Sequence, residues 1–192
     1  MLPIYEAAWE MHVFLTRKKI PYALIGGVAV QKWGQPRLTQ DVDLTISVPV
    51  EKTDGFVDEI EQHFKARVSE LREFVRRTRV LPIYASNGRK VDISLALPGY
   101  EDLLMQRAQP FKLTPRRSVR VCSVEDLIIH KAVAGRQQDL SDLQNIIYRN
   151  APALDLNYIR SWLKEFSLLL ETDEVSRRFE MSLQKRQEKS SR

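Results

Sequence analysis

Residues 24–46 read LIGGVAVQKWGQPRLTQDVDLTI, and two features of this stretch decide the fold. Gly26 and Gly27 interrupt an otherwise well-packing apolar sequence, and Asp41 and Asp43 alternate with apolar residues. Side chains two positions apart on a strand point to the same face, so these carboxylates would lie side by side. Both features cost stability, and this indicates that they serve a ligand.

Composition sets the outer limits. The chain has 192 residues, which suits one domain or a domain with a helical appendage. A composition of 43% hydrophobic and 29% charged residues is typical of globular rather than disordered proteins. The single cysteine, Cys122, permits no internal disulfide, and neither a signal peptide nor a membrane-spanning run is evident. We therefore expect a cytoplasmic protein without a membrane partner.

The hydrophobic pattern predicts an α+β (α/β) fold, in which a small mixed β-sheet with flanking helices precedes a helical C-terminal part. Strands are expected over IPYALIG, DVDLTISV, TRVLPIYAS, RKVDISLAL and SVRVCS. Asn87-Gly88 predicts a hairpin between the third and fourth of them. Helices are expected at the N-terminus, after the glycine pair, over 51–65, near 100–108, over VEDLIIHKAVAG and DLSDLQNIIYRN, and after Pro152. The predicted boundaries are a core over 1–122, a helical part over 123–185, and a fraying helix or tail over 186–192.

A third acidic residue has the same setting as the first two. Asp92 lies between Val91 and Ile93 on the predicted hairpin strand. Hard oxygen ligands in this arrangement suit Mg²⁺ or Mn²⁺, which keep waters and recruit phosphate oxygens. Three aspartates from adjacent strands are the donors that a two-metal phosphoryl-transfer site requires. The glycine turn before a helix adds close backbone approach and unpaired N–H groups, which favour phosphate.

These motifs together resemble those of a known superfamily. The pattern IGG, thirteen residues, DVDL and a later VDI is similar to the signature of the DNA polymerase β-like nucleotidyltransferases. The context GGVAV…RLTQDVDL with VEDLIIHKAVAGRQQDLSDL downstream resembles the AbiEii-type group, which includes toxins of bacterial toxin–antitoxin systems. The resemblance covers about residues 22–166, and it implies the polymerase β-like nucleotidyltransferase fold.

The resemblance also implies a reaction. Asp41 and Asp43 would hold the metal bound to a nucleoside triphosphate, and with Asp92 they would hold a second metal at the acceptor hydroxyl. The acceptor attacks the α-phosphorus and pyrophosphate leaves. Gly26 and Gly27 would cradle the β- and γ-phosphates. Many superfamily members have serine after the first glycine, where this chain has Gly27, although the AbiEii-type group often shows Gly-Gly.

Lys131 is the most informative residue outside the aspartates. It falls on the apolar stripe of Val124, Leu127 and Ile128, where a charge needs a partner or a phosphate. The resemblance favours a triphosphate-binding and catalytic lysine, and the alternative is a snorkelling or salt-bridged one.

Five further residues fall in the group's motifs. Arg136, Asp139 and Asp142 follow Lys131, and Asp139 could cap the next helix or, with Asp142, orient Lys131 or Arg136. Arg37 and Thr39 match the R-x-T-x-D-x-D pattern of nucleotide-binding members. Alternatively, Thr39 satisfies turn backbone groups and Arg37 pairs with a surface acid.

The net charge of +5 is unevenly distributed. Basic residues gather in the segments 65–79 and 107–120 and near the C-terminus. Such segments can attract RNA, or they can be ordinary solvated faces. We expect an RNA 3′ end, that of tRNA, as acceptor, and an antitoxin as a possible protein partner. A protein side chain or an aminoglycoside-like small molecule is the alternative acceptor, and a non-catalytic nucleotide- or RNA-binding module is the alternative class.

Overall fold

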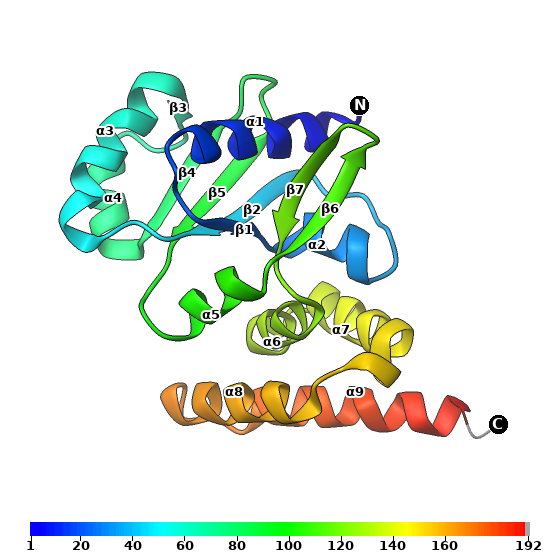
Figure 1. Cartoon of the computed structure of the whole chain (residues 1–192). Helices are drawn as coiled ribbons and strands as arrows, with labels where there is room; N and C mark the ends of the chain where they lie inside the picture. Colours follow the sequence, from blue (N-terminus) through cyan, green and yellow to red (C-terminus); the bar gives the residue numbers. More distant parts are fainter. Residues whose placement is uncertain (191–192) are drawn as a thin grey trace. The chain divides into compact units, whose positions relative to one another are not determined.

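The computed structural model describes the backbone of residues 1–190 and the side chains of residues 1–188. It shows a mixed α/β architecture with one mixed sheet and helices before, between and after its strands (Figure 1). The predicted fold class is therefore confirmed. The chain divides into two compact units, residues 1–28 with 38–122 and residues 29–37 with 123 onward. The domain boundaries expected from the sequence stay a prediction.

The first unit contains the sheet. Its helices are α1 (Pro3–Arg17), the start of α2 (Gly26–Trp33), η1 (Val50–Lys52), α3 (Thr53–His63), α4 (Leu71–Thr78) and α5 (Tyr100–Arg107). Its strands are β1 (Tyr22–Leu24), β2 (Asp41–Ile46), β3 (Lys65–Ala66), β4 (Val80–Tyr84), β5 (Lys90–Leu95), β6 (Gln109–Thr114) and β7 (Arg117–Val121). The described strands lie in the order β3-β4-β5-β2-β1-β7-β6.

Strand β2 lies at the centre of this sheet and fixes the geometry of the acidic residues. It runs parallel to β5, with Asp41 opposite Lys90 and Asp43 opposite Asp92. Val42 and Leu44 are fully buried, whereas Asp41 and Asp43 are half-buried on the opposite face. The alternation predicted from the sequence is therefore present.

Three elements of this unit were not predicted. Strand β3 has only two residues and pairs with β4 at the sheet edge. Helix α4 buries Leu71 and Val75, which are spaced i,i+4. The apolar pattern of this helix is weak because three of its eight residues are arginines. Strand β6 contains Pro110, which suits an edge strand, and pairs only with β7.

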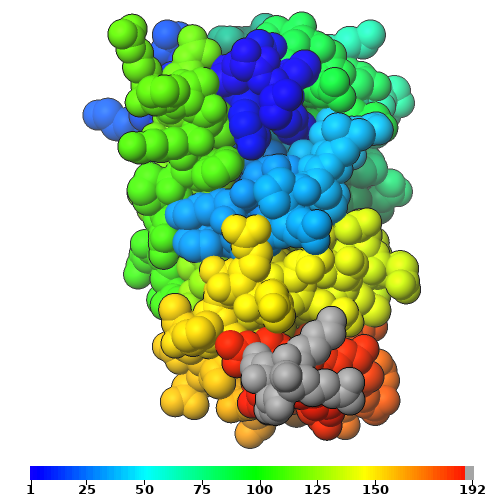
Figure 2. Space-filling view, turned by 90° about the vertical axis from the view of Figure 1, so that its right-hand side faces the viewer, coloured from blue at the N-terminus to red at the C-terminus, as the bar shows by residue number. Residues whose placement is uncertain are grey.

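The N-terminal helix packs against this hairpin. Helix α1 contacts β7, and the Tyr5 and Phe111 rings meet edge to face at 6.1 Å. Figure 2 shows the start of the chain (dark blue) beside the β6–β7 hairpin (green), which projects into solvent. The exposed Lys112 and Arg116 belong to this hairpin.

The second unit is helical. After residues 29–37 it consists of α6 (Val124–Ala134), α7 (Gln137–Asn150), η2 (Ala151–Ala153), α8 (Leu156–Leu169) and α9 (Glu174–Ser190). Ser123 caps α6 by accepting the Asp126 N–H at 3.1 Å, and Gly135 ends it in the left-handed conformation with φ 61°.

The end of this unit is one long helix, α9. Helix α9 places Val175, Phe179 and Leu183 in the core, at the spacing of an amphipathic stripe. The expected tail over 186–192 is helical up to Ser190, and the last two residues lie outside the described part of the chain. Within the described residues, no helix combines the length and the apolar character needed to cross a membrane.

Candidate active site

The three aspartates predicted from the sequence share one face of two neighbouring strands in the first unit. Asp43 and Asp92 are register partners in a parallel pair, where strands lie about 4.8 Å apart. Asp41 is two residues before Asp43 on the same face. Burial raises the pKa of Asp92, and the negative charge of Asp41 adds to this rise, while the Arg67 and Lys90 charges oppose it. The charge of Asp41 therefore acts on the Asp92 carboxyl group.

Gly26 and Gly27 border these acids for steric reasons. Gly26 begins α2 with φ 55°, and a Cβ at this position would lie 2.2 Å from Asp43 Oδ2. A Cβ on Gly27 would lie 2.2 Å from Thr39 Oγ1. The glycine pair therefore lets the N-terminus of a helix approach the acidic face to a distance that no other residue allows. Any side chain at position 27 would have to displace Thr39.

Arg67 contacts this face and was not singled out from the sequence. Its Nη2 donates to Asp92 Oδ1, and the two side chains are 20% and 33% exposed. Arg67 follows the short strand β3, and its backbone N–H donates to the Pro82 carbonyl at 2.9 Å. Because Pro82 is the register partner of Asp92 on β4, this bond sets Arg67 beside the third aspartate. The sequence showed Arg67 only as one residue of a basic segment. Its place beside Asp92 depends on β3, which is too short to be predicted from a sequence pattern.

The donor chemistry on this face fits Mg²⁺ or Mn²⁺. Three carboxylates provide hard oxygen ligands, and the absent Cβ of Gly26 accommodates the Asp43 carboxylate. In residues 1–188, however, no three His, Cys, Asp or Glu side chains are gathered as a ready-made metal centre. The face thus supplies suitable ligands on rigid strands, with one of them, Asp92, held by Arg67.

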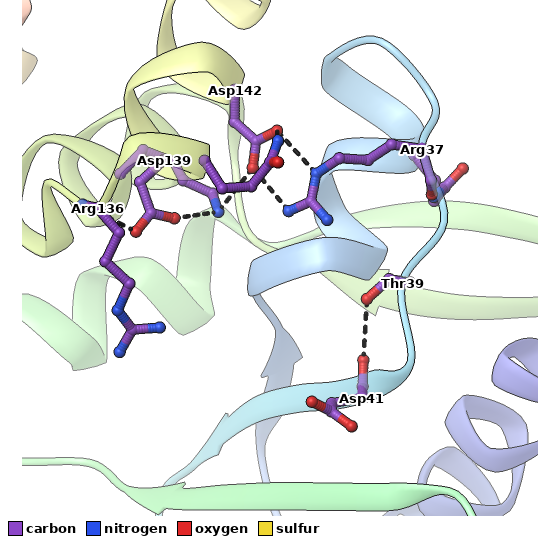
Figure 3. Close-up of polar contacts among 9 residues, drawn as sticks. Arg37, Thr39, Asp41, Arg136, Asp139 and Asp142 are labelled. Carbon is purple, nitrogen blue, oxygen red and sulfur yellow. Dashed lines mark hydrogen bonds and ion pairs between the residues drawn. The ribbon is translucent and has the colours of Figure 1, made fainter.

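The second unit contains a separate network around Lys131. This lysine is 6% exposed, and its Nζ lies 2.7 Å from Asp139 Oδ1 and 2.9 Å from Asp142 Oδ2. Arg37 binds Asp142 with two parallel bonds, Nε and Nη2 each at 2.8 Å (Figure 3). Burial acts to raise the pKa of Asp142, but the hydrogen bonds from Arg37 and Lys131 outweigh it and hold that pKa below its usual value. Two cations and two anions thus satisfy one another in the interior.

Two of the remaining predicted residues, Asp139 and Thr39, form hydrogen bonds to backbone groups. Asp139 accepts the Arg136 N–H at 3.3 Å and so caps α7, while the Arg136 guanidinium points away from both acids (Figure 3). Thr39 Oγ1 donates to the Asp41 carbonyl at 3.3 Å. Arg37 pairs with the buried Asp142 and not with a surface acid.

A family model matches most of this chain. The family described as "Nucleotidyl transferase AbiEii toxin, Type IV TA system" aligns with residues 14–186. The chain belongs to this AbiEii family. It is a nucleotidyltransferase, as its motifs predicted. Among curated proteins, none matches the sequence significantly.

Solved structures share the fold of this AbiEii-family protein at low sequence identity. The antibiotic-resistance factor ANT(2'')-Ia superposes with a TM-score of 0.57 at 14% identity, covering 87% of this chain and 95% of its own. A nucleotidyltransferase-like antigen from Paracoccidioides brasiliensis gives 0.55 at 18% identity and covers 92% of each chain. The lincomycin-bound lincosamide antibiotic adenylyltransferase LnuA gives 0.52 at 14% identity, covering 73% and 94%.

One titratable group beside the Lys131 network predicts an acid sensitivity of this AbiEii-family protein. Burial lowers the pKa of His130 from 6.5 to about 4, and the Lys131 charge adds to the effect. The folded state therefore binds fewer protons than the unfolded state between these values. The stability that neutral His130 contributes is complete above pH 6.5 and is lost as pH falls toward 4.

We expect the free energy of unfolding to fall by about 1–2 kcal/mol between pH 7.5 and 5 because of His130. Urea unfolding at both pH values measures this loss. The His130→Gln variant, which cannot be protonated there, should lose less stability over the same interval. An equal loss in the variant and the wild type would assign the acid sensitivity to other groups.

Proposed function

We propose that this nucleotidyltransferase moves a nucleoside monophosphate from a triphosphate to an acceptor hydroxyl in a reaction that depends on Mg²⁺ or Mn²⁺. The observation that carries the proposal is the shared face of Asp41, Asp43 and Asp92 beside the Gly26 helix start. Bound divalent cations there would supply charge neutralisation and a more acidic acceptor hydroxyl.

Each residue on this face has a proposed task. Asp41 and Asp43 would hold the cation that accompanies the triphosphate, and with Asp92 they would hold a second cation at the acceptor hydroxyl. The N–H groups of Gly26 and Gly27 bind the β- and γ-phosphates at the positive end of α2. The acceptor oxygen forms a bond to the α-phosphorus as the bond to pyrophosphate breaks.

The network residues belong to the proposal as nucleotide-binding residues through their family motifs. These residues are Arg37, Thr39, Lys131, Arg136, Asp139 and Asp142. Lys131 and Arg37 also neutralise two buried acids of the second unit, Asp139 and Asp142. Arg136 is exposed, and its guanidinium points away from Asp139 and Asp142 (Figure 3).

The acceptor that we propose is an RNA 3′ end, that of tRNA. The support is the positive charge of the β6–β7 hairpin, where Lys112, Arg116 and Arg117 are exposed. Counterions are released when RNA phosphates meet such side chains. The basic segment 65–79 offers less positive charge to RNA than its sequence indicated. Two of its arginines, Arg72 and Arg76, already pair with Asp54 and Asp58 of α3.

The decisive experiment incubates the protein with Mg²⁺, each labelled triphosphate and purified tRNA. We expect the label in tRNA, pyrophosphate release, and no labelling when the 3′ ribose has been oxidised beforehand, because the nucleophile is then gone.

Three phosphate contacts on the hairpin predict a log–log salt slope of about −2 for RNA binding, at about 0.7 per contact.

Matched variants locate the RNA surface. Lys112→Ala with Arg116→Ala should flatten the salt slope to about −0.7 while triphosphate binding is retained. Arg72→Ala with Arg76→Ala removes the same charge from residues that are already paired, so the slope should stay near that of the wild type. Equal slopes for both double variants would remove the hairpin from the proposal.

A small-molecule acceptor is the second candidate. It is favoured by the fold shared with ANT(2'')-Ia and LnuA, named as an antibiotic-resistance factor and a lincosamide adenylyltransferase. Labelling of an aminoglycoside, a lincosamide or a protein, with no labelling of RNA, would select these acceptors. Tight triphosphate binding without transfer to any pool would select a non-catalytic module.

The family description supplies a biological setting for the proposal. We propose that the protein acts as the toxin of a toxin–antitoxin pair and has an antitoxin partner. A cytoplasmic location agrees with a single, buried cysteine, Cys122, which permits no internal disulfide. Arrested growth on expression of the wild type, relieved by Asp43→Asn, is the expected result.

A further inference from the structure

Arg67 and Asp92 form an incomplete ion pair on the proposed catalytic face. Within the described residues, one hydrogen bond joins the two groups: Nη2 of the guanidinium donates it and Oδ1 of the carboxylate accepts it. The buried Nε has no hydrogen-bond partner in the part of the chain that the structure describes. A buried donor without an acceptor is costly, and native structures rarely keep one without a reason.

The same chain shows how a settled arginine–carboxylate pair looks. Arg37 donates both Nε and Nη2 to Asp142, each at 2.8 Å, and its acceptor is 3% exposed. Such two-point pairing is the preferred geometry for a permanent bridge. Arg67 instead uses one donor on an acceptor that is one-third exposed. This geometry suits a contact that the protein can break.

The acid that Arg67 holds is one that a cation would need. Asp92 is the register partner of Asp43 and is influenced by the Asp41 charge. With Arg67 in place, one of the three negative charges is already neutralised and one Asp92 oxygen is occupied. A second cation near Asp92 would meet a guanidinium that is permanently charged.

We propose that Arg67 is the internal counter-ion of the active site: it holds Asp92 while the second cation is absent and leaves Asp92 when that cation binds. This inference rests on the two-metal function proposed above. The exchange keeps the affinity for a free divalent cation low. A triphosphate bound with its own cation at Asp41 and Asp43 would offer phosphate oxygens as further ligands to the second cation, and these would help the second cation to displace Arg67. Arg67 is thus a positioning residue that ties metal loading to the nucleotide.

The test measures Mn²⁺ binding without nucleotide, by the electron paramagnetic resonance signal of free Mn²⁺. Arg67→Met should bind Mn²⁺ about tenfold more tightly than the wild type, since an adjacent charge shifts carboxylate equilibria by about one to three powers of ten. Arg67→Lys, which keeps the charge, should remain near the wild type. A purely structural role for Arg67 predicts weaker binding in both variants.

Lys90→Met is the matched control for charge. Lys90 also acts on Asp92 through its charge, but it is exposed on β5 and is the register partner of Asp41. Removing it should change Mn²⁺ affinity by no more than about twofold, because exposed charges are well screened. In an Asp92→Asn background, Arg67→Met should lose its tightening effect.

The outcomes separate this inference from the proposed function. Equal Mn²⁺ affinity in wild type and Arg67→Met, or an equal gain in Lys90→Met, overturns the counter-ion role and leaves the two-metal site standing. Absence of Mn²⁺ binding from the wild type and every variant, even with triphosphate, rejects the metal site and this inference with it. If Arg67→Met does not fold, Arg67→Gln replaces it with the same expected gain.

Discussion

Pyrophosphate release by the Asp43→Asn variant is expected to fall about a hundredfold, equivalent to about 3 kcal/mol of transition-state stabilisation. Asp43 adjoins both parts of the proposed site. Asp92 is its register partner on β5, and the absent Cβ of Gly26 leaves room for its Oδ2. The asparagine side chain keeps the shape but loses the charge that holds a divalent cation. The same change at Asp92 should have a similar effect.

Turnover is measured with saturating Mg²⁺, triphosphate and acceptor, and urea unfolding accompanies it. Stability should be retained or increased, because removing one charge relieves repulsion among the three aspartates. Asp58→Asn is the matched control: Asp58 is an exposed acid of the same unit and pairs with Arg72 at the surface. It should leave turnover unchanged. Full activity of Asp43→Asn would exclude the two-metal assignment.

The acidic face could be predicted from the sequence because its signal is local. Alternation around Asp41 and Asp43 sets their common face, and Asn87-Gly88 sets the hairpin that contains Asp92. What local patterns could not give is the parallel pairing of β2 with β5, which joins segments far apart in the chain. From the sequence we expected the strands to be adjacent, and their parallel direction and register come from the structure.

The network around Lys131 shows where local reasoning ended. The sequence named Asp139 and Asp142 as acids that could orient Lys131, and both contact it. The pairing of Asp142 with Arg37 was not foreseen, because Arg37 comes from a distant segment of the chain. Arg67 was missed for a related reason. Its position depends on a two-residue edge strand, and a strand that short has no periodicity to detect.

Replacement of Lys131 by methionine is expected to lower the free energy of unfolding by about 3 kcal/mol, because breaking a buried ion pair leaves an uncompensated charge. Asp142 would keep Arg37 and the Gln138 amide, at 3.2 Å. Among the described residues, Asp139 would keep the Arg136 N–H alone, so most of the loss should come from this acid.

A double-mutant cycle in urea tests that attribution. Adding Asp139→Asn to Lys131→Met removes the unpaired charge and should recover part of the loss, with a coupling energy of about 1–3 kcal/mol. Lys164→Met is the control, since Lys164 is an exposed lysine of α8 in the same unit, and it should change stability by less than about 0.5 kcal/mol.

Triphosphate binding by the folded fraction of Lys131→Met then separates the two proposed roles. Weakened binding means that the lysine also contacts the nucleotide, whereas unchanged binding limits it to holding Asp139 and Asp142. A variant as stable as the wild type would show that the buried pairs contribute nothing to folding.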